Sequence, residues 1–198
     1  MFPLGTVLFP HGLLPLHVFE PRYQALTRYC LDSDRQLGIV LIERGSEVGG
    51  GDVRVPLGTR AHIVEAMALG DGRWYLVLVG GDRIRVARWL PEDPFPRAEI
   101  EVVEELHGGD TARRGVVEGL LRRALAFKAE LGEAAAPATA DLDPDLDVAT
   151  WQAATMAPVG PADAQRLLEA PSTDERQRLL EAMLHDEVAV LAHRVGGG

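Results

Sequence analysis

Four aspartates that alternate along the stretch DLDPDLD come closest, in type and spacing, to a ligand-binding site: Asp141, Asp143, Asp145 and Asp147. Carboxylates at alternate positions are typical of calcium loops. An EF-hand loop that begins at Asp141, however, requires glycine at position 146 and glutamate at position 152. The chain has Leu146 and Gln152 there. We therefore interpret the aspartates as a solvated connector whose last members cap a helix, and we predict no metal and no cofactor.

Two histidines and one glutamate are the remaining candidates for acid–base chemistry. His11 and His17 flank a strand-like run, without the His-Glu-x-x-His spacing of zinc enzymes. Glu20 could act as a general base, so a hydrolase that uses Glu20 and His17 stays an alternative, but no nucleophile accompanies them. The charge of Glu20 would instead complement the dipole of a helix that begins at Pro21. We predict no catalytic residue, and hence a protein that is not an enzyme.

The composition is that of a soluble globular chain with an acidic surface. Of its 198 residues, 46% are apolar and 25% charged, and the net charge is −10. This charge repels phosphate backbones and so disfavours nucleic acid as a partner. No basic leader precedes the first apolar run, and no apolar run reaches the roughly 18 residues of a membrane span. We expect a cytoplasmic protein without membrane contact. Its one cysteine, Cys30, excludes an internal disulfide and is expected in a helix core.

A run of arginines keeps an RNA-binding alternative open. In RIRVARW, Arg83, Arg85 and Arg88 are expected to point outward, beside Trp89. Basic and aromatic side chains together are typical of nucleic-acid surfaces. The next strand carries several glutamates, Glu99 and Glu101 among them, which could pair with these arginines across the sheet. The pattern therefore favours internal ion pairs over a phosphate-binding face.

The opening stretch, residues 1–23, is the part around which the β structure is organised. Its two apolar runs, Val7–Phe9 and Leu13–Phe19, predict short strands, and prolines at positions 3, 10, 15 and 21 confine them to edges, ends or bulges. Pro21 suits the first position of a helix that runs to about Asp32. This stretch predicts the first wall of a β structure followed directly by a helix.

Further strands are predicted by apolar runs and alternation between residues 37 and 106. They are Leu37–Ile42, Leu57–Leu69, Trp74–Val79, Arg83–Leu90 and Ala98–Leu106. Asp71-Gly72 predicts a tight hairpin, and Gly80-Gly81-Asp82 a second turn. The glycine-rich stretch from Glu43 to Asp52 lacks the Lys-Ser/Thr of a phosphate-binding loop and is interpreted as a hairpin loop. The strands together predict a small closed or nearly closed β structure.

The second half of the chain has a helical pattern. Asp110 is a good N-cap for an amphipathic helix to about Leu131, and Asp143-Pro144 and Gly160-Pro161 begin two shorter helices. Ser172 and Glu175 have the spacing of a capping box before a last long helix. We predict two parts: residues 1–108, a β subdomain with one helix, and residues 109–198, a helical bundle.

Several motifs, in order, resemble the N-terminal domain of Lon proteases. The opening has Pro-Leu, an apolar triplet ending in Phe-Pro, a second Pro-Leu, and an arginine that leads the helix. Gly-Thr-x-Ala-x-Ile at 58–63 and Gly-x-x-Arg at 80–83 follow, and LLEAPSTDERQRLLEAML at 167–184 resembles the end of the helical part of such domains. The signature positions are Pro3, Phe9, Pro10, Pro15, Arg22, Gly58, Gly80 and Arg83.

The resemblance implies an α+β fold: a PUA-like β-barrel or pseudo-barrel, followed by a C-terminal helical bundle. In Lon this region recognises substrate proteins and helps assembly but does not cut. The chain has no Gly-x-x-x-x-Gly-Lys-Ser/Thr. Its Lys128 and its serines, Ser33, Ser46 and Ser172, lie in no context like the Ser-Lys dyad of the Lon peptidase. The implied protein is a free-standing, non-enzymatic Lon N-domain, related to proteolysis by binding rather than by cleavage.

The predicted function is the binding of unfolded or extended polypeptide, or of a protein partner, in a groove between barrel and bundle. Extended chains suit apolar grooves and strand edges because backbone hydrogen bonds add affinity without sequence demands. Aromatic side chains expected to line the groove are Tyr23, Trp89, Phe95 and Trp151. The alternative is an RNA-binding PUA-like module, and the oligomeric state is left open.

Overall fold

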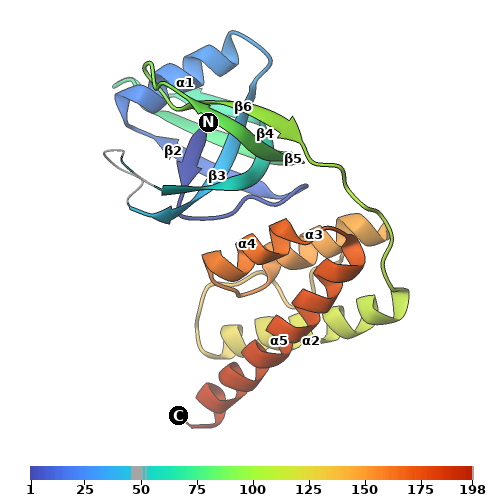
Figure 1. Cartoon of the computed structure of the whole chain (residues 1–198). Coiled ribbons are helices and arrows are strands. Elements are labelled where there is room, and N and C mark those ends of the chain that lie inside the picture. The colour runs from blue at the N-terminus through green and yellow to red at the C-terminus, as the bar shows by residue number, and fades with distance from the viewer. Residues whose placement is uncertain (46–50, 52, 198) are drawn as a thin grey trace. The chain divides into compact units, whose positions relative to one another are not determined.

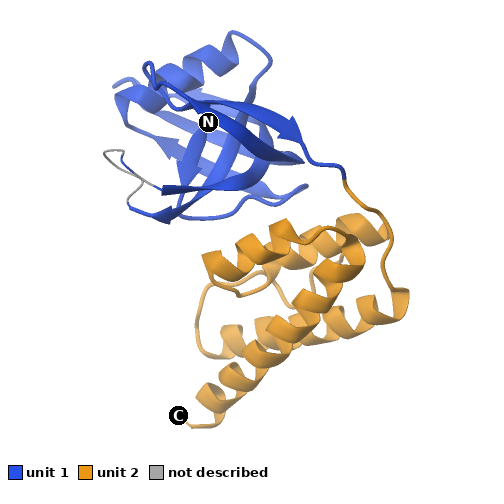
Figure 2. Ribbon diagram, in the orientation of Figure 1, with its two compact units in different colours: residues 1–104 blue, residues 105–198 orange. Residues whose placement is uncertain are grey.

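A computed structural model describes residues 1–45, 51 and 53–197 of the chain (Figure 1). The chain forms two compact units, residues 1–104 and residues 105–198 (Figure 2). The predicted glycine-rich hairpin loop, Glu43 to Asp52, lies largely outside the described residues. Each unit has its own core and is described by itself.

The first unit is a six-stranded mixed sheet with one helix. In chain order its elements are β1 (Phe2–Leu4), β2 (Leu13–Val18), α1 (Pro21–Leu31), β3 (Gln36–Arg44), β4 (Val53–Ala68), β5 (Trp74–Leu90) and β6 (Arg97–Val102). Strand β1 is parallel to β3, and all other pairs are antiparallel. The strand path is β1-β3-β4-β5-β2, and β6 pairs with β5. Because β1 and β2 end this path, the described sheet is open, and the prediction of a barrel is not confirmed.

The core of the first unit lies between the sheet and α1. The helix begins at Pro21 as predicted, and its Tyr23, Leu26 and Cys30 are buried at spacings of three and four residues. The ring of Phe2, from β1, stacks on Tyr23 with 4.0 Å between centroids. Strand β3 carries the continuous apolar run and is buried along residues 37–41. An apolar helix face and a central strand thus meet in one core.

The prediction of a strand at Val7–Phe9 is wrong, since this run has no sheet partner among the residues that the structure describes. Its residues are held by single contacts instead. The carbonyl of Leu8 accepts a hydrogen bond from Thr59 Oγ1 at 2.5 Å. The carbonyl of Phe9 lies so close to Gly80 that a Cβ there would stand 2.0 Å from it. Leu8 and Phe9 are buried, so the apolar run belongs to the core without joining the sheet.

The predicted turn at Gly80-Gly81-Asp82 is also wrong, because β5 passes through it unbroken. Strand β5 carries one more residue than β4 between the pairs Ala61↔Gly80 and Thr59↔Arg83. This bulge places both Gly80 and Arg83 on the buried side. Arg83, which the sequence places outward, is therefore buried, and its Nη2 donates to the Glu104 carbonyl at 3.4 Å.

The second unit consists of four helices: α2 (Thr111–Glu130), α3 (Leu146–Met156), α4 (Pro161–Glu169) and α5 (Thr173–Gly196). The predicted caps are confirmed at Asp110, which accepts from the Ala112 amide at 2.8 Å, and at Ser172, which accepts from the Glu175 amide at 3.3 Å. Helices α2 and α5 pack along each other through buried leucines, Leu121, Leu125, Leu180 and Leu184 among them. No helix among the described residues has the length and apolarity to span a membrane.

Candidate functional site

The outer face of the sheet, away from the α1 core, exposes apolar side chains on three adjacent strands. Register sets His17 of β2 opposite Tyr75 of β5, which in turn is opposite Met67 of β4. One row further along the strands, Pro15 is opposite Val77. The buried residues between them, such as Leu76 and Leu78, point to the core. We call the surface made by Leu13, Pro15, His17, Phe19, Met67, Tyr75, Val77 and Val79 the outer apolar face.

The outer apolar face is unusually exposed for large side chains. Leu13 is 66% exposed, Met67 56% and Tyr75 48%. The His17 ring stacks on Tyr75 with 4.7 Å between centroids, and the exposed Phe19 ring lies 6.0 Å from it. These contacts form a continuous band rather than scattered single residues. Contiguous apolar surface of this kind marks interaction sites.

A cavity is lined by residues from both ends of the strand path. Its volume is about 50 Å³, and we call it the seam cavity. Strands β1 and β2 and the start of α1 supply its lining, which is Phe2, Leu4, Leu16, His17, Val18, Phe19, Glu20 and Tyr23. In the described structure the covered Nε2 atom of His17 has no hydrogen-bond partner. The cavity thus adjoins the outer apolar face through His17 and Phe19, which belong to both.

The four aromatic residues predicted to line a groove occupy different surroundings. Tyr23 and Phe95 are buried in the same core, and Tyr23 also borders the seam cavity. Trp89 is half-buried beneath the guanidinium of Arg54, at 4.7 Å. Trp151 belongs to the second unit and is buried there. The structure brings Tyr23 to the candidate site, while a binding role for any of the four stays a prediction.

Sequence reasoning missed the exposed members of the site, chiefly Leu13, Met67 and Tyr75. The signal that could have found them is apolar character on both faces of a strand. In LLPLHV and WYLVLV nearly every position is apolar, although one face alone of such a strand meets the α1 core. Two apolar faces predict that the second face is also covered by something.

The signature positions of the resemblance have structural roles. A Cβ at Gly58 would stand 2.1 Å from the Ile39 carbonyl, so β3 and β4 approach closely there because the residue is glycine. Arg22 pairs with Glu20 at 3.2 Å and with Glu92 at 3.9 Å, and so ties α1 to the loop before β6. The others, Pro3, Phe9, Pro10 and Arg83, are buried, and Pro15 lies in β2.

Three of the four alternating aspartates, Asp143, Asp145 and Asp147, have structural partners. Asp145 caps α3 through the Val148 amide at 3.0 Å, and Asp147 lies 2.8 Å from His107 Nδ1. Within the described ranges, no three His, Cys, Asp or Glu side chains are grouped as metal ligands. Among the described residues that line the seam cavity, none is a serine, threonine, cysteine or lysine. His17 and Glu20 both border it, but without a nucleophile between them.

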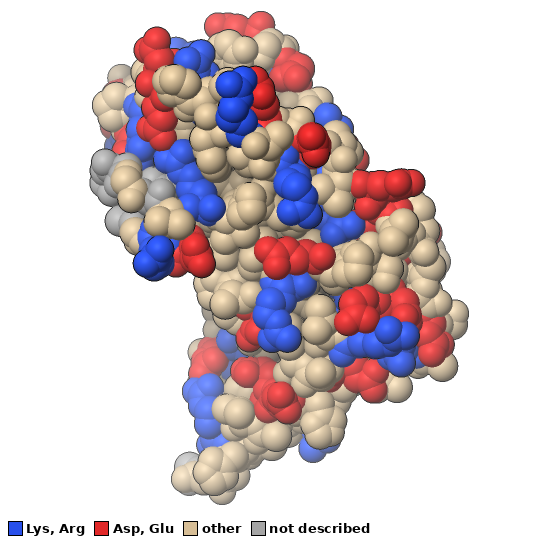
Figure 3. All heavy atoms as spheres, in the orientation of Figure 1, with Lys and Arg blue, Asp and Glu red and all other residues tan. Residues whose placement is uncertain are grey.

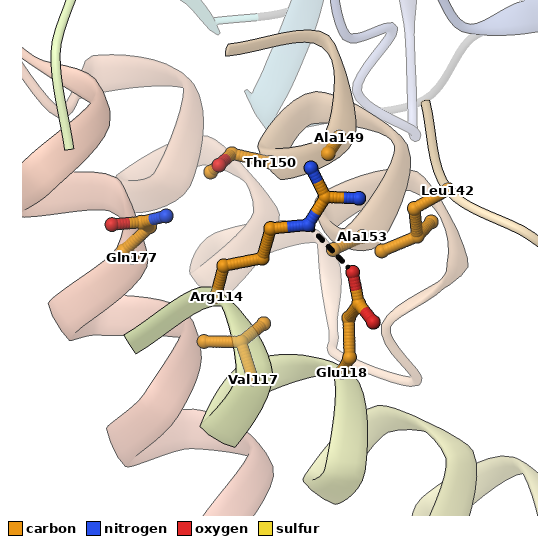
Figure 4. Close-up of a pocket in the computed structure, with 8 residues that line it drawn as sticks. All are labelled: Arg114, Val117, Glu118, Leu142, Ala149, Thr150, Ala153 and Gln177. Atoms are coloured by element: carbon orange, nitrogen blue, oxygen red, sulfur yellow. Dashed lines mark hydrogen bonds and ion pairs between the residues drawn. The ribbon is translucent and has the colours of Figure 1, made fainter. Parts of the chain in front are cut away.

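A second, smaller cavity lies in the helical unit. Its volume is about 10 Å³, which is room for no more than about one water molecule. Arg114 of α2 reaches across it and donates to the Glu118 carboxylate at 2.7 Å, the dashed line in Figure 4. The remaining lining side chains are mostly small or apolar, such as Ala149, Ala153 and Val117. This cavity is a packing feature of the bundle and not a ligand site.

Three arginines of the sheet, Arg54, Arg60 and Arg88, are paired with carboxylates. Arg88 donates to Glu99 at 3.2 Å, as the alternation predicts, and Arg54 pairs with Glu92 at 2.7 Å. Arg60 is paired with Asp82. Figure 3 shows the same intermixing, with basic and acidic side chains side by side over the face in view. This arrangement does not favour a phosphate-binding surface.

Comparison with known proteins gives one consistent result. The family model of the ATP-dependent protease La (LON) substrate-binding domain matches residues 1–186. "Lon protease 2" of Herpetosiphon aurantiacus is 27% identical over 193 residues, which cover 95% of this chain and 23% of that protein. "Lon protease 2" of Sorangium cellulosum is 30% identical over 201 residues, covering 94% and 24%. The chain therefore spans about a quarter of the length of these relatives.

Solved structures agree with the family match. A Lon N-terminal domain protein from Xanthomonas campestris superposes with a TM-score of 0.65 at 26% identity, covering 91% of this chain and 95% of that one. The N-terminal domain of a Mycobacterium avium complex Lon protease, at 16% identity and a TM-score of 0.61, shares the fold over 93% of this chain and 97% of its own. The chain belongs to the Lon substrate-binding domain family.

Proposed function

We propose that this chain binds unfolded or extended polypeptide, and that it does so on the outer apolar face of the first unit. Two observations support the proposal. The family is named for substrate binding, and the chain exposes a band of large apolar side chains on one sheet face. Folded proteins bury such side chains, while unfolded ones expose them, so the face discriminates between the two states.

Burial of the outer apolar face contributes part of the free energy of binding. Full burial of a leucine, methionine or aromatic side chain contributes about 1.5–3 kcal/mol. Leu13, Met67 and Tyr75 are each about half exposed or more, so covering all three contributes about 3–5 kcal/mol of the roughly 8 kcal/mol that a micromolar dissociation constant requires. We expect affinities in the micromolar range, weak enough for release.

The role proposed for the chain is binding without cleavage. The matching family model is that of the substrate-binding domain. The described site offers apolar contact and one imidazole, but no nucleophile paired with a base. Its proposed partner is therefore a polypeptide that another activity processes or refolds.

The test is a fluorescence anisotropy titration with a labelled, reduced and alkylated protein that cannot fold. The variant Leu13→Ser/Met67→Ser/Tyr75→Ser should bind at least about tenfold more weakly than the parent chain. A matched control is Val116→Ser/Val190→Ser, which removes exposed valines from the helical unit and should change the affinity by less than about twofold. The proposal fails if the parent chain does not bind, or if both variants bind as the parent does.

A further inference from the structure

We infer that the bound segment adds as an antiparallel β-strand to the free edge of β2, with one set of side chains on the outer apolar face and the other in the seam cavity. This inference rests on the proposed function and specifies its substrate class. The class is extended segments that are apolar on both faces, as buried strands of other proteins are. Amphipathic helices are excluded, since their backbone groups are already bonded internally.

The edge of β2 is available because β2 ends the strand path. Among the described strands it pairs with β5 alone, over Leu13–Val18. An unpaired edge presents a row of backbone donors and acceptors, which is a template for another extended chain. Hydrogen bonding of this kind specifies the occupant as a strand, whatever its sequence.

Two hydrogen bonds just before β2 determine which backbone groups face the free edge, because they make Gly12 and Gly80 a bonded pair. The His11 amide donates to the Gly80 carbonyl at 2.8 Å, and the Gly80 amide donates to the Gly12 carbonyl at 2.9 Å. Bonded and non-bonded pairs alternate along an antiparallel ladder. Leu14 and its alternate successors, 16 and 18, therefore bond to β5, while the backbone groups of residues 13, 15 and 17 point away from it.

Pro15 agrees with this assignment. Proline has no amide hydrogen, so it is tolerated in a sheet where that group would face outward. The edge then offers the N–H and C=O groups of Leu13 and His17 and the C=O of Pro15. These groups can form a short antiparallel ladder with an incoming strand.

The side chains of an added strand would find apolar surroundings on both sides. Strands in a sheet lie about 4.8 Å apart, so outward residues of the new strand extend the row of Met67, Tyr75 and His17. Inward residues lie over the seam cavity, which β2 shares with Phe2 and Leu4 of β1. At about 50 Å³ the cavity holds several water-sized groups, enough for a valine side chain and too little for a phenylalanine ring.

Charge adds a preference to this geometry. Glu65 is exposed on β4 and lies opposite Val77 of β5, which in turn lies opposite Pro15 of β2. Within the described parts of the chain, Glu65 has no ion-pair partner. A basic residue flanking the apolar segment would pair with it, and an acidic one would be repelled. For an exposed pair we expect about a two- to fivefold preference.

The probe is a synthetic peptide of alternating valine and phenylalanine with lysines at both ends. Phenylalanine is too large for the seam cavity, so its residues face outward, opposite positions 13, 15 and 17, with their N–H groups toward β2. N-methylation of the phenylalanines should weaken binding at least about tenfold. N-methylation of the valines, whose N–H groups point away from β2, should weaken it by less than about threefold. Equal effects of the two modifications would overturn the inference.

A measurement on the protein gives the same test independently. The amide hydrogens of Leu13 and His17 should exchange at least about tenfold more slowly at saturating peptide, while that of Leu16, already bonded to β5, should not change. If the parent peptide binds by anisotropy without protecting Leu13 and His17, strand addition is wrong and the proposed function stands. If the chain binds the unfolded protein of the first titration but not this peptide, strand addition is wrong and the proposed function stands; if it binds neither, both fail.

Two variants complete the design. Leu13→Pro removes one edge-facing N–H, and Leu13→Ala is its matched control, since it loses the side chain but keeps the N–H. We expect Leu13→Pro to bind about two- to tenfold more weakly than Leu13→Ala, as one hydrogen bond predicts. The parent chain should bind the lysine-flanked peptide more tightly than a glutamate-flanked one. The Glu65→Lys variant should show the opposite preference. Equal affinities in the first pair would contradict the hydrogen-bonding role of the edge.

Discussion

The guanidinium carbon of Arg176 lies 3.3 Å from the ring centroid of Trp151, inside the helical unit. The same arginine donates to the Leu167 and Ala170 carbonyls, at 3.3 and 3.2 Å, and pairs with Glu105 at 2.9 Å. One buried cation thus holds α3, the end of α4, α5 and the segment that enters the bundle. Trp151, which the sequence predicts as a groove residue, instead packs its ring against the guanidinium of Arg176.

Replacement of Arg176 should therefore destabilise the protein strongly. In Arg176→Ala the Glu105 carboxylate and two carbonyls lose their partner, which costs about 3–5 kcal/mol for a broken buried pair. Arg178→Ala is the control, because Arg178 is exposed and its ion pairs with Asp174 and Glu175 contribute less than about 1 kcal/mol. Urea unfolding followed by circular dichroism measures both. Similar midpoints for the two variants would contradict the role of Arg176.

Gly80 should not tolerate a side chain. In Gly80→Ala the new Cβ would overlap the Phe9 carbonyl, 2.0 Å away, and β5 or the opening loop must move. We expect a loss of at least about 2 kcal/mol in the free energy of unfolding. The contrast is Gly115→Ala in α2, where nothing lies within 4 Å and alanine favours the helix by about 0.5–1 kcal/mol. A neutral Gly80→Ala would show that Phe9 is not held against β5.

Stability should fall at alkaline pH because of Cys30. Burial raises the pKa of this thiol from its ordinary value of 9.0 to about 11. Below pH 9 the thiol is protonated in both the folded and the unfolded chain, and its contribution is constant. Between pH 9 and 11 the unfolded chain releases the proton while the folded one retains it, so unfolding becomes easier as pH rises.

The comparison that isolates this effect is between the parent chain and Cys30→Ala. Other groups titrate equally in both, so the difference between their urea midpoints should narrow as pH rises from 8.5 to 11. Iodoacetamide should also label the native thiol far more slowly than the urea-unfolded one at pH 8.5. A parallel pH dependence of the two proteins would rule out a shifted thiol pKa.

Asp147 should matter for the fold of the bundle and not for calcium. Its carboxylate lies 2.8 Å from His107 Nδ1 and accepts a hydrogen bond from the Thr173 hydroxyl. Asp147→Ala should cost about 1–3 kcal/mol because two hydrogen-bonding groups lose their acceptor, whereas Asp141→Ala, an exposed site, should cost less than about 0.5 kcal/mol. The thermal midpoint of the parent chain should be the same in calcium and in a chelator. A calcium-dependent midpoint would restore the metal interpretation.

Local chemistry explains which elements could be predicted. Some features act only on neighbours in sequence, so the sequence predicts them directly. They are Pro21 at a helix start, Asp110 and Ser172 as helix caps, and the apolar run of β3. The turn predicted at Gly80-Gly81-Asp82 is wrong because glycine pairs favour turns only locally. Strand β5 instead continues through these residues, packed against Phe9 in a contact between residues about seventy positions apart.

The sequence predicts that the candidate site is apolar, but not which residues form it. Residue type drew attention to Tyr23 and Trp151, but aromatic rings occur in cores as readily as on surfaces, and both proved to be buried. The exposed face depends on strand order: β2 pairs with β5, sixty residues later, and ends the path there. Strand order is set by long-range pairing, which no local pattern in the sequence encodes.

The open strand path has a consequence for behaviour at high concentration. A free edge beside an apolar surface attracts any extended segment, including one from another copy of the same chain. Pro15 interrupts the run of edge donors at its centre, and β1, at the other end of the path, is three residues long. The edges of β1 and β2 are therefore poor templates for the long, uninterrupted ladders from which fibrils grow.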